Sequence, residues 1–587
     1  MPKTSGSVHF AFQDQAVKDD AAFSVNTAQS FVDSSDLNDF NVCAKWATFE
    51  NDFWVLDGSF YLMADPPEAS RVGYISGVMS DEFSEFSINP ELTIDFDTTY
   101  SVDGLKLFFS KLDWVTYMRV RFYNSSNTLI QDDYYSPNTY QFYTEQPVAN
   151  FKKIIITFIE TSQPYRFVKL ENIDFGQSFI FSDTSLKKAV VYEEIDPSSI
   201  KLPYNTLDIE ILRDEDLLGL IDTANDYPID IYGIIDIDIH FMGRFYLSSW
   251  ELVNNNLIKI NAVDMLGKYA NVETDGGVWG FTWNTSFWGA DPYGSGQFVN
   301  NPTETADNVF DSIMSDSGLS GSVDPSLSSE NVYGWLKING ARDALRNLAF
   351  GVGGYVTCAR SLSVQMLPLL LANDIVTHNY EITRAMQARG TKKTIKEQIK
   401  DFVLTTAKYH LPDPNDDLTV LFYAYGNSYF AIGVENIKML CSKPCIISTT
   451  YPRPFGFPSY SGTYTKAVNY IVLNSTATRS IIIDAPYCTF KNNEITTNVN
   501  ANGTNLYIKD AQLVTNSNSS DVIDRVVDYI SQRYVADIKT FGIPIAPGDS
   551  VLVDISDTEQ ISGIAEKVET DLMNGFVSKI KVVGIIA

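Results

Sequence analysis

Ile235-Asp236-Ile237-Asp238-Ile239 is the stretch of this sequence that decides its fold class. Isoleucine and aspartate alternate with a period of two, which is the pattern of a β-strand with one buried and one solvated face. Residues 245–252 and 257–263 continue the pattern on either side of Asn254-Asn255-Asn256. Asparagine tolerates the left-handed backbone of tight turns. We therefore expect a half-solvated strand at 235–239 and a β-hairpin over 245–263.

This hairpin carries a specific sequence motif. Residues 243–247 read Gly-Arg-Phe-Tyr-Leu and lead to Trp250, and residues 260–268 read Ile-Asn-Ala-Val-Asp-Met-Leu-Gly-Lys. This motif resembles one found in the hub proteins at the distal end of bacteriophage tails and of phage-tail-like particles, the tailocins. The resemblance implies a structural subunit of the virion tail tip or baseplate, made in the cytoplasm of a bacterial host.

Residues 44–59 carry a second resemblance. They read Ala-Lys-Trp-Ala-Thr-Phe-Glu-Asn-Asp-Phe-Trp-Val-Leu-Asp-Gly-Ser, which looks like the opening of a jelly roll in tail-hub relatives, similar to galactose-binding, discoidin-like modules. Short apolar stretches with polar turns between them follow, and this spacing predicts an all-β sandwich. The expected strands lie at 92–96, 105–110, 118–123 and 153–158.

The residues before the jelly roll alternate in the same way, at 8–12 and 22–25. We expect both to pair with strands after Lys187, which would make the jelly roll an insertion at an exposed turn. The fold class is therefore mainly β with α+β elements: hub β-barrel domains plus a β-sandwich jelly roll. The expected divisions are 1–39 (N-terminal strands of the hub barrel), 40–176 (jelly roll), 177–300 (first hub barrel with an aromatic loop), 301–400 (α+β hub domain) and 401–587 (second barrel and C-terminal α+β region).

Three helices are predicted from apolar residues at helical spacing. The first begins at Thr303, a candidate N-cap, and stops at Gly318. The second covers 341–350 and ends at Gly351, and a hairpin over 355–367 follows it. The third covers 520–534 and precedes a Pro-Gly-Asp turn and a strand at 551–554. The helix–hairpin element and the C-terminal element also resemble tail hubs.

Five carboxylates alternate with isoleucines and predict a strongly acidic sheet face. One interpretation is a solvated outer face, another is the lining of a channel, and a calcium site is the least favoured because ligands two residues apart on a strand rarely converge. The residues are Asp208, Glu210, Asp230, Asp236 and Asp238.

A glycine-rich aromatic stretch follows the hairpin block. Aromatic side chains at this density are costly to leave in water, since each could bury on the order of 200 Å². A satellite core, a subunit interface and a sugar-stacking platform are all open, and we expect part of the stretch to contact another chain. The residues are Trp279, Phe281, Trp283, Phe287 and Trp288.

Charge and cysteine usage exclude several classes of function. The chain has 587 residues and a formal net charge of −30, which repels the phosphate backbone and argues against sequence-specific nucleic-acid binding. No signal peptide and no membrane-spanning stretch is expected. The five scattered cysteines fit reduced thiols and not a disulfide framework; they are Cys43, Cys358, Cys441, Cys445 and Cys488.

The sequence carries none of the common catalytic motifs. The sequence has no His-Glu-x-x-His, no Gly-x-Ser-x-Gly and no P-loop, and its four histidines do not stand beside a nucleophile. We expect no enzyme activity, no cofactor and no metal site.

The tail-hub resemblance implies a definite set of partners. The family forms a homotrimeric ring that caps the tail tube, anchors the tape-measure protein and a tip or spike protein, meets the distal tail or tube protein and lets DNA pass. An alternative is a carbohydrate-binding adhesin whose jelly roll recognises a surface glycan of the host. A second alternative is a tail-associated cell-wall hydrolase.

Overall fold

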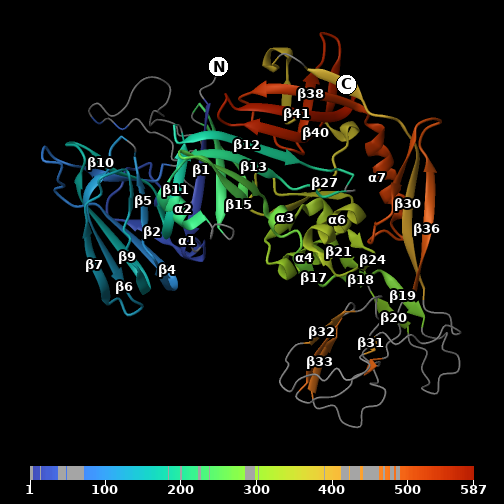
Figure 1. The fold of residues 1–587 in the computed structure, drawn as a ribbon, viewed down its shortest axis with the longest axis horizontal. Helices are drawn as coiled ribbons and strands as arrows, with labels where there is room; N and C mark the ends of the chain where they lie inside the picture. Colours follow the sequence, from blue (N-terminus) through green and yellow to red (C-terminus); the bar gives the residue numbers. More distant parts are fainter. Residues whose placement is uncertain are drawn as a thin grey trace.

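A computed structural model of the chain shows a mainly β protein (Figure 1). The structure describes residues 4–37 without 14, residues 48 and 50, 72–284 without 111, 183, 199–200, 222–226 and 237, 298–388 without 302, 391–410, five short strands between 422 and 483, and 489–587. In Figure 1 the jelly roll (blue) lies at the left, a first group of hub strands (green) in the centre and the C-terminal strands (red) at the upper right.

The jelly roll is a sandwich of two sheets around an aromatic core that includes Phe109, Phe151 and Phe158. All four strands predicted for it are confirmed. The five-stranded sheet has the order β2 (Ala22–Val25), β4 (Glu91–Val102), β9 (Val148–Thr161), β6 (Val115–Tyr123) and β7 (Leu129–Tyr135). The four-stranded sheet has the order β3 (Tyr74–Met79), β10 (Phe167–Asp174), β5 (Lys106–Phe109) and β8 (Gln141–Tyr143).

A second group of strands, which we call the first β-unit, curls around its own core. Each of its strands supplies alternate apolar side chains to the interior, among them Val8, Ile209 and Ile260. The described strands form an open, barrel-like sheet and not a closed barrel. Their order is β11 (Gly176–Ser182), β1 (Thr4–Gln13), β14 (Pro228–Ile235), β15 (Asp238–Asn254), β16 (Leu257–Val263), β13 (Thr206–Leu212) and β12 (Leu186–Glu194).

The N-terminal strands divide between the two sheets. β1 pairs with β11 and with β14, which follows Lys187. The expectation that residues 22–25 also pair there was wrong, because β2 pairs with β4 inside the jelly roll. The short helix α1 (Gln15–Asp20) leads the chain from one sheet to the other. The jelly roll thus lies between two paired strands of the first β-unit, while the domain divisions at 39, 176, 300 and 400 stay predictions.

Residues 235–239 are divided between two strands, with a turn at Asp236, so the prediction of a single strand was wrong. β14 ends at Ile235, β15 begins at Asp238, and Asp236 has a left-handed φ of 56°. Aspartate accepts this conformation more readily than most residues. The hairpin predicted over 245–263 is confirmed, since Asn254 pairs with Leu257 at the end of β15 and β16.

The C-terminal strands form a second β-unit around a core that includes Ile538, Val553 and Val568. The strand predicted at 551–554 is confirmed there as β39. The order is β28 (Tyr380–Ile382), β39 (Ser550–Asp554), β40 (Gln560–Asp571), β41 (Val577–Ile586), β38 (Tyr534–Phe541) and β29 (Lys392–Ile395).

The two β-units repeat one pattern of strand connections. In chain order, β12, β13, β14, β15 and β16 correspond to β29, β38, β39, β40 and β41. The pairs β12–β13, β13–β16, β14–β15 and β15–β16 recur as β29–β38, β38–β41, β39–β40 and β40–β41, all of them antiparallel. The units are therefore topological equivalents without an evident sequence repeat.

A helical layer lies between the two units in the chain. Its main helices are α4 (Ala306–Ser317) and α6 (Ala341–Val352), which share a core with β26 (Gly354–Thr357) and β27 (Val364–Pro368). Thr305, and not Thr303, caps α4 by accepting a bond from the Asn308 amide, and Gly318 ends it with a φ of 68°, as predicted. α6 ends at Gly353 instead of Gly351, again through a left-handed glycine.

Smaller elements complete this layer. α3 (Met265–Lys268), α5 (Pro325–Ser328) and β22 (Gly321–Val323) flank the main helices. Two-stranded pairs join β17 (Glu273–Thr274) to β25 (Asn339–Gly340), β18 (Gly277–Trp279) to β24 (Gly334–Leu336), β19 (Phe281–Asn284) to β20 (Phe298–Asn301) and β21 (Glu304–Thr305) to β23 (Asn331–Val332). α2 (Glu215–Leu220) caps the first β-unit.

The segment before the second β-unit contains a ribbon and the third predicted helix. β30 (Ile399–His410) pairs with β36 (Thr489–Asn498) and β37 (Thr504–Ile508). α7 (Ser519–Ser531) buries Val522, Ile523 and Val526 as expected. The other described strands here are β31 (Phe422–Tyr423), β32 (Ile437–Leu440), β33 (Gly462–Lys466), β34 (Tyr470–Ser475) and β35 (Ile482–Ile483).

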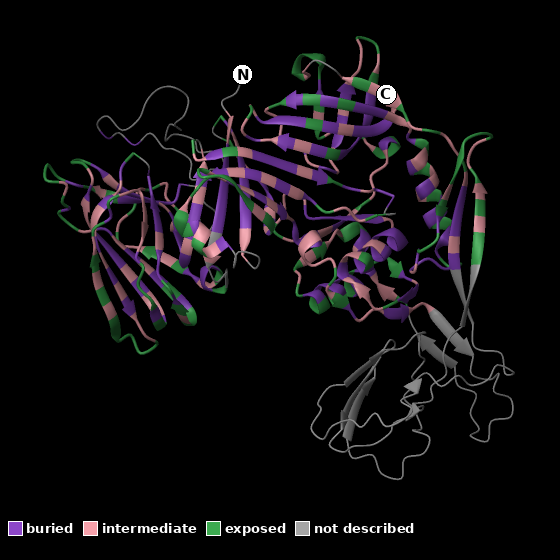
Figure 2. Cartoon of the chain, viewed as in Figure 1, coloured by how far each residue is buried: buried purple, intermediate pink, exposed green. Residues whose placement is uncertain are grey.

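The second β-unit also inserts side chains into the first. Leu572 and Phe576, from the turn between β40 and β41, are fully buried in the core of the first β-unit. A Cβ added at Gly233 of β14 would lie 2.3 Å from the Phe576 ring, so a glycine is needed for this close approach. Figure 2 shows buried residues (purple) along the strands of both units.

Phe576→Ala is expected to lower the free energy of unfolding of the first β-unit by about 3 kcal/mol or more, because it leaves a cavity under Gly233. Differential scanning calorimetry would show the loss as a lower melting temperature. Leu129→Ala, on an exposed jelly-roll strand, is the control and should change stability by less than about 0.5 kcal/mol. Equal effects of the two variants would contradict the inserted position of Phe576.

Candidate functional site

The two β-units share one continuous sheet, because β12 of the first pairs with β40 of the second. Residues 190–194 lie antiparallel to residues 567–571. The Ile195 amide extends the pairing by donating to the Glu566 carbonyl over 2.9 Å. Main-chain hydrogen bonds therefore hold the units side by side, and we call this contact the β12–β40 junction.

Arg360 ties three segments together at the β12–β40 junction. It lies in the turn between β26 and β27, with a φ of 53°, and its guanidinium donates to the Glu193 carboxylate of β12 at 2.9 Å. The same group donates to the carbonyl oxygens of Pro544 and Ile545, each at 2.8 Å. One side chain thus connects the helical layer with both β-units.

The environment of this pair makes the arginine important for stability. Glu193 is 1% exposed. Burial raises the pKa of Glu193, and the nearby charge of Arg360 opposes that rise. Removing the cation would leave an uncompensated buried carboxylate, which costs more free energy than the intact pair contributes.

Glu566 organises a second charged cluster on β40. Its carboxylate accepts hydrogen bonds from Lys396 at 3.1 Å, from Lys581 at 2.8 Å and from the Tyr529 hydroxyl of α7. Burial acts to raise the pKa of Glu566, but the two lysines and the hydroxyl outweigh it and hold the pKa below its usual value. The cluster fastens α7 and the segment after β29 onto the shared sheet.

Asp174 performs the same task between the jelly roll and the first β-unit. It is fully buried at the end of β10 and accepts hydrogen bonds from Lys18 of α1 at 2.6 Å and from Ser178 of β11 at 2.6 Å. His9 of β1 lies 3.2 Å away. Burial opposes ionisation here, yet the charges of Lys18 and His9 hold the pKa of Asp174 well below its usual range.

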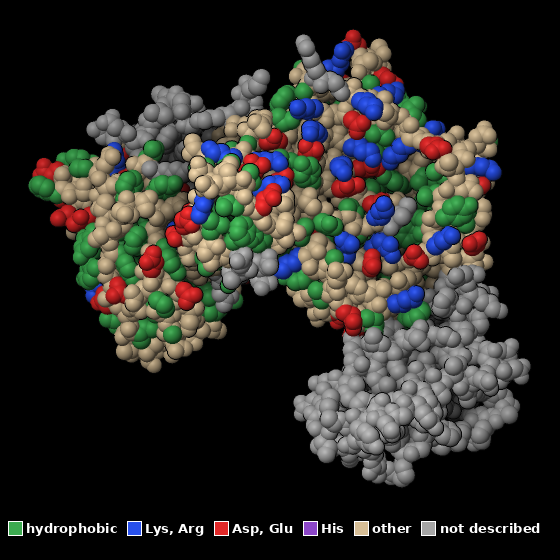
Figure 3. Space-filling view, viewed as in Figure 1, with side chains coloured by type: hydrophobic (Ala, Val, Ile, Leu, Met, Phe, Trp, Pro, Cys, Tyr) green, Lys and Arg blue, Asp and Glu red, His purple; other side chains and the backbone are tan. Residues whose placement is uncertain are grey.

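The solvent face of the shared sheet carries a ladder of cross-strand ion pairs. Lysines and carboxylates of neighbouring strands alternate over it, as Figure 3 shows in the centre and at the upper right. Each exposed pair contributes at most about 1 kcal/mol, so the ladder mainly sets a balanced surface charge. The pairs are Lys259–Glu251 at 3.0 Å, Lys188–Asp208 at 2.5 Å, Lys567–Glu194 at 2.9 Å and Lys579–Glu569 at 2.5 Å.

The predicted acidic residues do not all lie on one face. Asp208 and Glu210 of β13 belong to the ladder, where lysines stand beside them. Asp230 is only 3% exposed and forms a two-bond pair with Arg244, both at 2.8 Å, so its assignment to a solvent or channel face was wrong. Asp236 and Asp238 are exposed at the β14–β15 turn. A channel-facing role for the other four stays a prediction.

The aromatic stretch is only partly described. Trp279 of β18 is half-buried against the core of the helical layer. The backbone of Phe281 and Trp283 forms β19, which pairs with β20, while Phe287 and Trp288 lie outside the described residues. Their assignment to a subunit interface stays a prediction.

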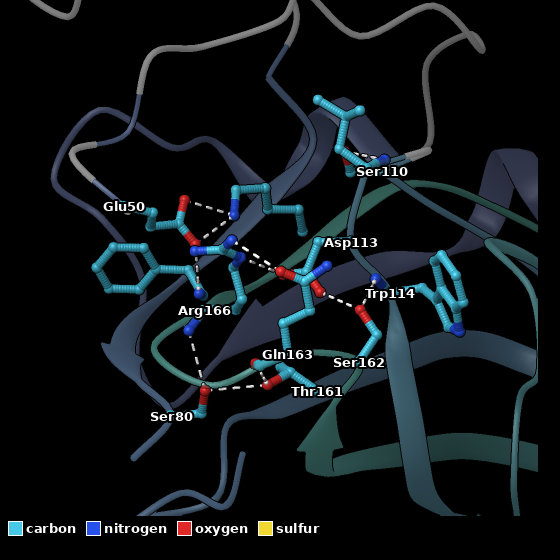
Figure 4. A network of polar contacts seen from close by, with 12 residues as sticks. Glu50, Ser80, Ser110, Asp113, Trp114, Thr161, Ser162, Gln163 and Arg166 are labelled. Carbon is cyan, nitrogen blue, oxygen red and sulfur yellow. Dashed lines mark hydrogen bonds and ion pairs between the residues drawn. The ribbon is translucent and has the colours of Figure 1, made fainter. Parts of the chain in front are cut away.

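The far end of the jelly roll holds a network of buried polar groups, drawn in Figure 4. Ser80 Oγ accepts a bond from the Arg166 amide and is bonded to Thr161, both at 2.9 Å. Ser162 donates to Asp113 at 2.5 Å. The bonds connect the loops after β3, β5 and β9, so the loops hold one another in place.

Charged side chains occupy the centre of this network. Lys169 donates to Glu50 at 2.6 Å, and Arg166 lies 3.8 Å from Asp113. Figure 4 shows Arg166 and Asp113 turned toward one another. Burial raises the pKa of Asp113 to about 6. The hydrogen bond from Ser162 and the nearby cations lower this pKa, but burial outweighs them.

Apolar side chains project from the tips of the three loops. Phe83 is 73% exposed, Leu112 52% and Tyr165 51%. The Tyr165 amide donates to the Asp81 carbonyl at 3.3 Å, which joins two of the tips directly. Rigid, exposed aromatic side chains are a common feature of recognition surfaces.

Metal-ligating side chains do not cluster in the described part of the chain. Within it, no three His, Cys, Asp or Glu side chains are grouped so that they could hold a metal ion. None of the described helices is long and apolar enough to cross a membrane. Cys358 is buried and unbridged, and burial raises the pKa of its thiol well above the usual value.

Sequence reasoning missed the residues that hold the units together. Arg360, Glu193 and Glu566 bear no motif, and their partners lie far away along the chain. Glu193 stands next to Glu194 in a strand that also carries Lys187 and Lys188, so nothing in the sequence indicated that this one carboxylate is buried and requires a partner.

Comparisons with known proteins give structural neighbours only. No protein-family model and no curated protein matches the chain. The chain is similar to the tail protein from Neisseria meningitidis MC58 (TM-score 0.39, 6% identity, 68% of this chain and 93% of that one). It is similar to the prophage MuSo2 43 kDa tail protein from Shewanella oneidensis (0.37, 11%, 69% and 94%).

Over 28% of its length the chain is also similar to the family 32 carbohydrate-binding module of C. perfringens NanJ in complex with galactose (TM-score 0.18, 10% identity, 97% of that chain). Tail proteins and galactose-binding modules are the two kinds of protein that the sequence resembles. At these identities the likeness concerns the fold, and at these TM-scores it does not decide the function.

Arg360→Met should lower the free energy of unfolding by about 3 kcal/mol, because it removes the cation beside buried Glu193. The double variant with Glu193→Gln should recover part of the loss. Lys579→Met, which breaks an exposed pair, is the control and should cost less than about 1 kcal/mol. Melting temperatures measured for the three variants test this, and equal losses for Arg360→Met and Lys579→Met would contradict the role of the buried pair.

Asp113 should make the jelly roll less stable as the pH rises. Its folded pKa of about 6 lies above the ordinary 3.8, so its contribution to stability is present below about pH 4 and is lost as the pH rises through 6. Asp113→Asn should reduce the change in the free energy of unfolding between pH 4 and 7 by on the order of 2 kcal/mol. Thermal melts between pH 4 and 7 measure it, and parallel pH profiles for the two proteins would contradict the raised pKa.

Proposed function

We propose that this chain is a structural hub subunit at the distal end of a bacteriophage or tailocin tail. Copies of it form a homotrimeric ring at the tail tip or baseplate, below the tube. The ring caps the tube, meets the distal tail or tube protein, anchors the tape-measure protein and a spike or tip protein, and lets DNA pass. No catalytic role is part of the proposal.

The observation that carries this proposal is the side-by-side placement of two equivalent β-units. A chain with two such units, joined by main-chain pairing at the β12–β40 junction, is a natural segment of a ring that has twice as many units as chains. Three chains supply six units, which suits a tube of six-fold symmetry. Closed rings are favoured because every contact surface then finds its partner.

The charge distribution is compatible with DNA passage. The net charge of −30 disfavours binding to phosphates, and the ladder on the shared sheet pairs its lysines with carboxylates. A surface of this kind offers DNA no run of free cations. The aromatic residues 279–288 remain proposed as a contact between subunits.

Antibody labelling of intact particles tests the position of the chain. We expect gold-labelled antibody against the chain to mark one end of the tail, opposite the capsid where a capsid exists. Antibody against the major tube protein is the control and should label only broken tubes or exposed tube surface. Labelling along the whole tail or on the capsid would contradict the proposal.

A second role, glycan recognition by the jelly roll, is favoured by the exposed tips Phe83 and Tyr165. Flat aromatic side chains stack on sugar rings, and here the buried network holds them in place. Phe83→Ala and Tyr165→Ala should each weaken binding to a glycan array at least about tenfold. Leu129→Ala, also exposed on the jelly roll, is the control, and unchanged binding in both tip variants would exclude this role for the tips.

A further inference from the structure

An amine, a carboxamide and a carboxylate meet where the chain enters and leaves the jelly roll. Lys18 of α1 donates a hydrogen bond to the side-chain carbonyl oxygen of Asn172 in β10 over 3.3 Å. The Asn172 amide nitrogen donates to Oδ1 of Asp174 over 3.1 Å, and the Lys18 ammonium donates to the same oxygen over 2.6 Å. Each of the three groups therefore contacts the other two.

The three groups are sealed from water. Lys18 is 4% exposed, Asn172 1% and Asp174 0%. Exclusion of water suppresses hydrolysis of the amide, which would compete with attack by an amine. Burial also disfavours charged groups, so transfer of a proton from the ammonium to the carboxylate, which makes both groups neutral, costs less here than in water.

The carboxylate of Asp174 is held so that one of its oxygens faces both nitrogens. Its Oδ2 accepts a hydrogen bond from the Ser178 hydroxyl over 2.6 Å and lies 3.2 Å from Nε2 of His9, while Oδ1 contacts Lys18 and Asn172. Burial opposes ionisation, but the charges of Lys18 and His9 hold the pKa of Asp174 well below its usual range. The group therefore rests as a carboxylate, the form that accepts a proton.

We propose that the Lys18 amine attacks the side-chain carbonyl carbon of Asn172 and forms an intramolecular isopeptide bond with release of ammonia. Attack requires the reacting atoms to lie about 3–3.5 Å apart. The lysine nitrogen already contacts the carbonyl oxygen, and Cγ is bonded to that oxygen, so a rotation within the lysine side chain brings the nitrogen to the carbon. The bond joins α1 covalently to β10.

The step is balanced in atoms and charge. Oδ1 of Asp174 takes one proton from the Lys18 ammonium, and the neutral amine forms a C–N bond to Cγ of Asn172. A second proton passes from the attacking nitrogen to Nδ2 of Asn172, the Cγ–Nδ2 bond breaks with its electron pair on Nδ2, and ammonia leaves. Ammonia takes the proton back from Asp174 and departs as ammonium. The reaction regenerates the carboxylate and needs no oxidant, reductant or co-reactant.

The bond would close the jelly roll into a covalent loop. Lys18 precedes the first jelly-roll strand, β2, and Asn172 lies 154 residues later in β10. Such a cross-link restricts the unfolded chain and thereby favours the folded state. Tension applied through β1 and β11 passes through the bond instead of unravelling the jelly-roll strands.

Mass spectrometry of the purified, folded chain tests the bond directly. The intact mass should be lower than the mass calculated from the sequence by that of one ammonia molecule. Trypsin does not cleave after an acylated lysine, so it should release residues 4–45 joined to residues 170–187 as one branched peptide. A chain without the bond gives residues 4–18 and 170–187 as separate peptides.

Variants that each remove one reacting group give the matched comparison. Lys18→Arg keeps a cation beside Asp174 but offers no amine, and Asn172→Leu removes the amide but keeps the ion pair. Both should have their full calculated mass and no branched peptide. Asp174→Asn removes the proton acceptor and should lower the linked fraction at least about tenfold. Lys187→Arg, which changes an exposed lysine, is the control and should stay fully linked.

A cut inside the jelly roll gives a second readout. A specific protease site inserted in the exposed turn at 125–127 divides the chain between Lys18 and Asn172. After cleavage, the parent chain should run as one linked species on a denaturing gel, because the bond holds the two pieces together. The Lys18→Arg chain with the same site should separate into two fragments.

A folded parent chain with its full calculated mass, or one that separates into two fragments after the cut, would overturn the bond. Loss of ammonia that persists in Lys18→Arg would place the reaction elsewhere and would also overturn it. An Asp174→Asn chain that melts cooperatively and is fully linked would overturn the role of Asp174. These outcomes are independent of the proposed ring, which antibody labelling tests separately.

Discussion

The main-chain pairing of β12 with β40 is the constraint on which the rest of the structure depends. It joins two small curled sheets into one continuous sheet. Loops and helices pack around this junction. Arg360 holds the helical layer and both units at this junction through Glu193, Pro544 and Ile545, and Phe576 crosses from one unit into the core of the other. A buried arginine with three anchors fixes relative position far better than a surface salt bridge would, since breaking it exposes an unpaired buried charge.

This arrangement explains why the candidate site is a surface and not a cleft. Several buried carboxylates join segments, as Asp174 joins β1, α1 and β10, or Glu566 joins α7 to the sheet. Charged groups employed in this way are paired and immobile. Among the described residues, the jelly-roll loop tips at Phe83 and Tyr165 stay exposed, which suits contact with other macromolecules. A rigid two-unit block with a jelly roll attached at its N-terminal strands fits a component of a larger assembly.

Local sequence patterns predicted much of the fold and little of its assembly. Helical spacing found α4, α6 and α7, and period-two alternation found the jelly-roll strands and the β15–β16 hairpin. The alternation at 235–239 predicted one strand wrongly, because the apolar–polar order continues through the turn at Asp236, and only the left-handed φ of Asp236 marks the break. Similarly, the pattern at 22–25 predicted the strand correctly. Its partner was predicted wrongly, because distant residues decide which strands pair. Arg360 and Glu193 are 167 residues apart, and the correspondence of the two β-units lies in their connections, for which single residues give no signal.

A cryo-electron microscopy map of the assembled chain, taken from native tails, tests the central claim most directly. The account predicts a closed ring at the distal tail end with two β-units per copy, six for three copies. A closed ring with any number of copies other than three would contradict it. A map in which the chain is a monomer or stands outside the tail end would contradict the account as a whole.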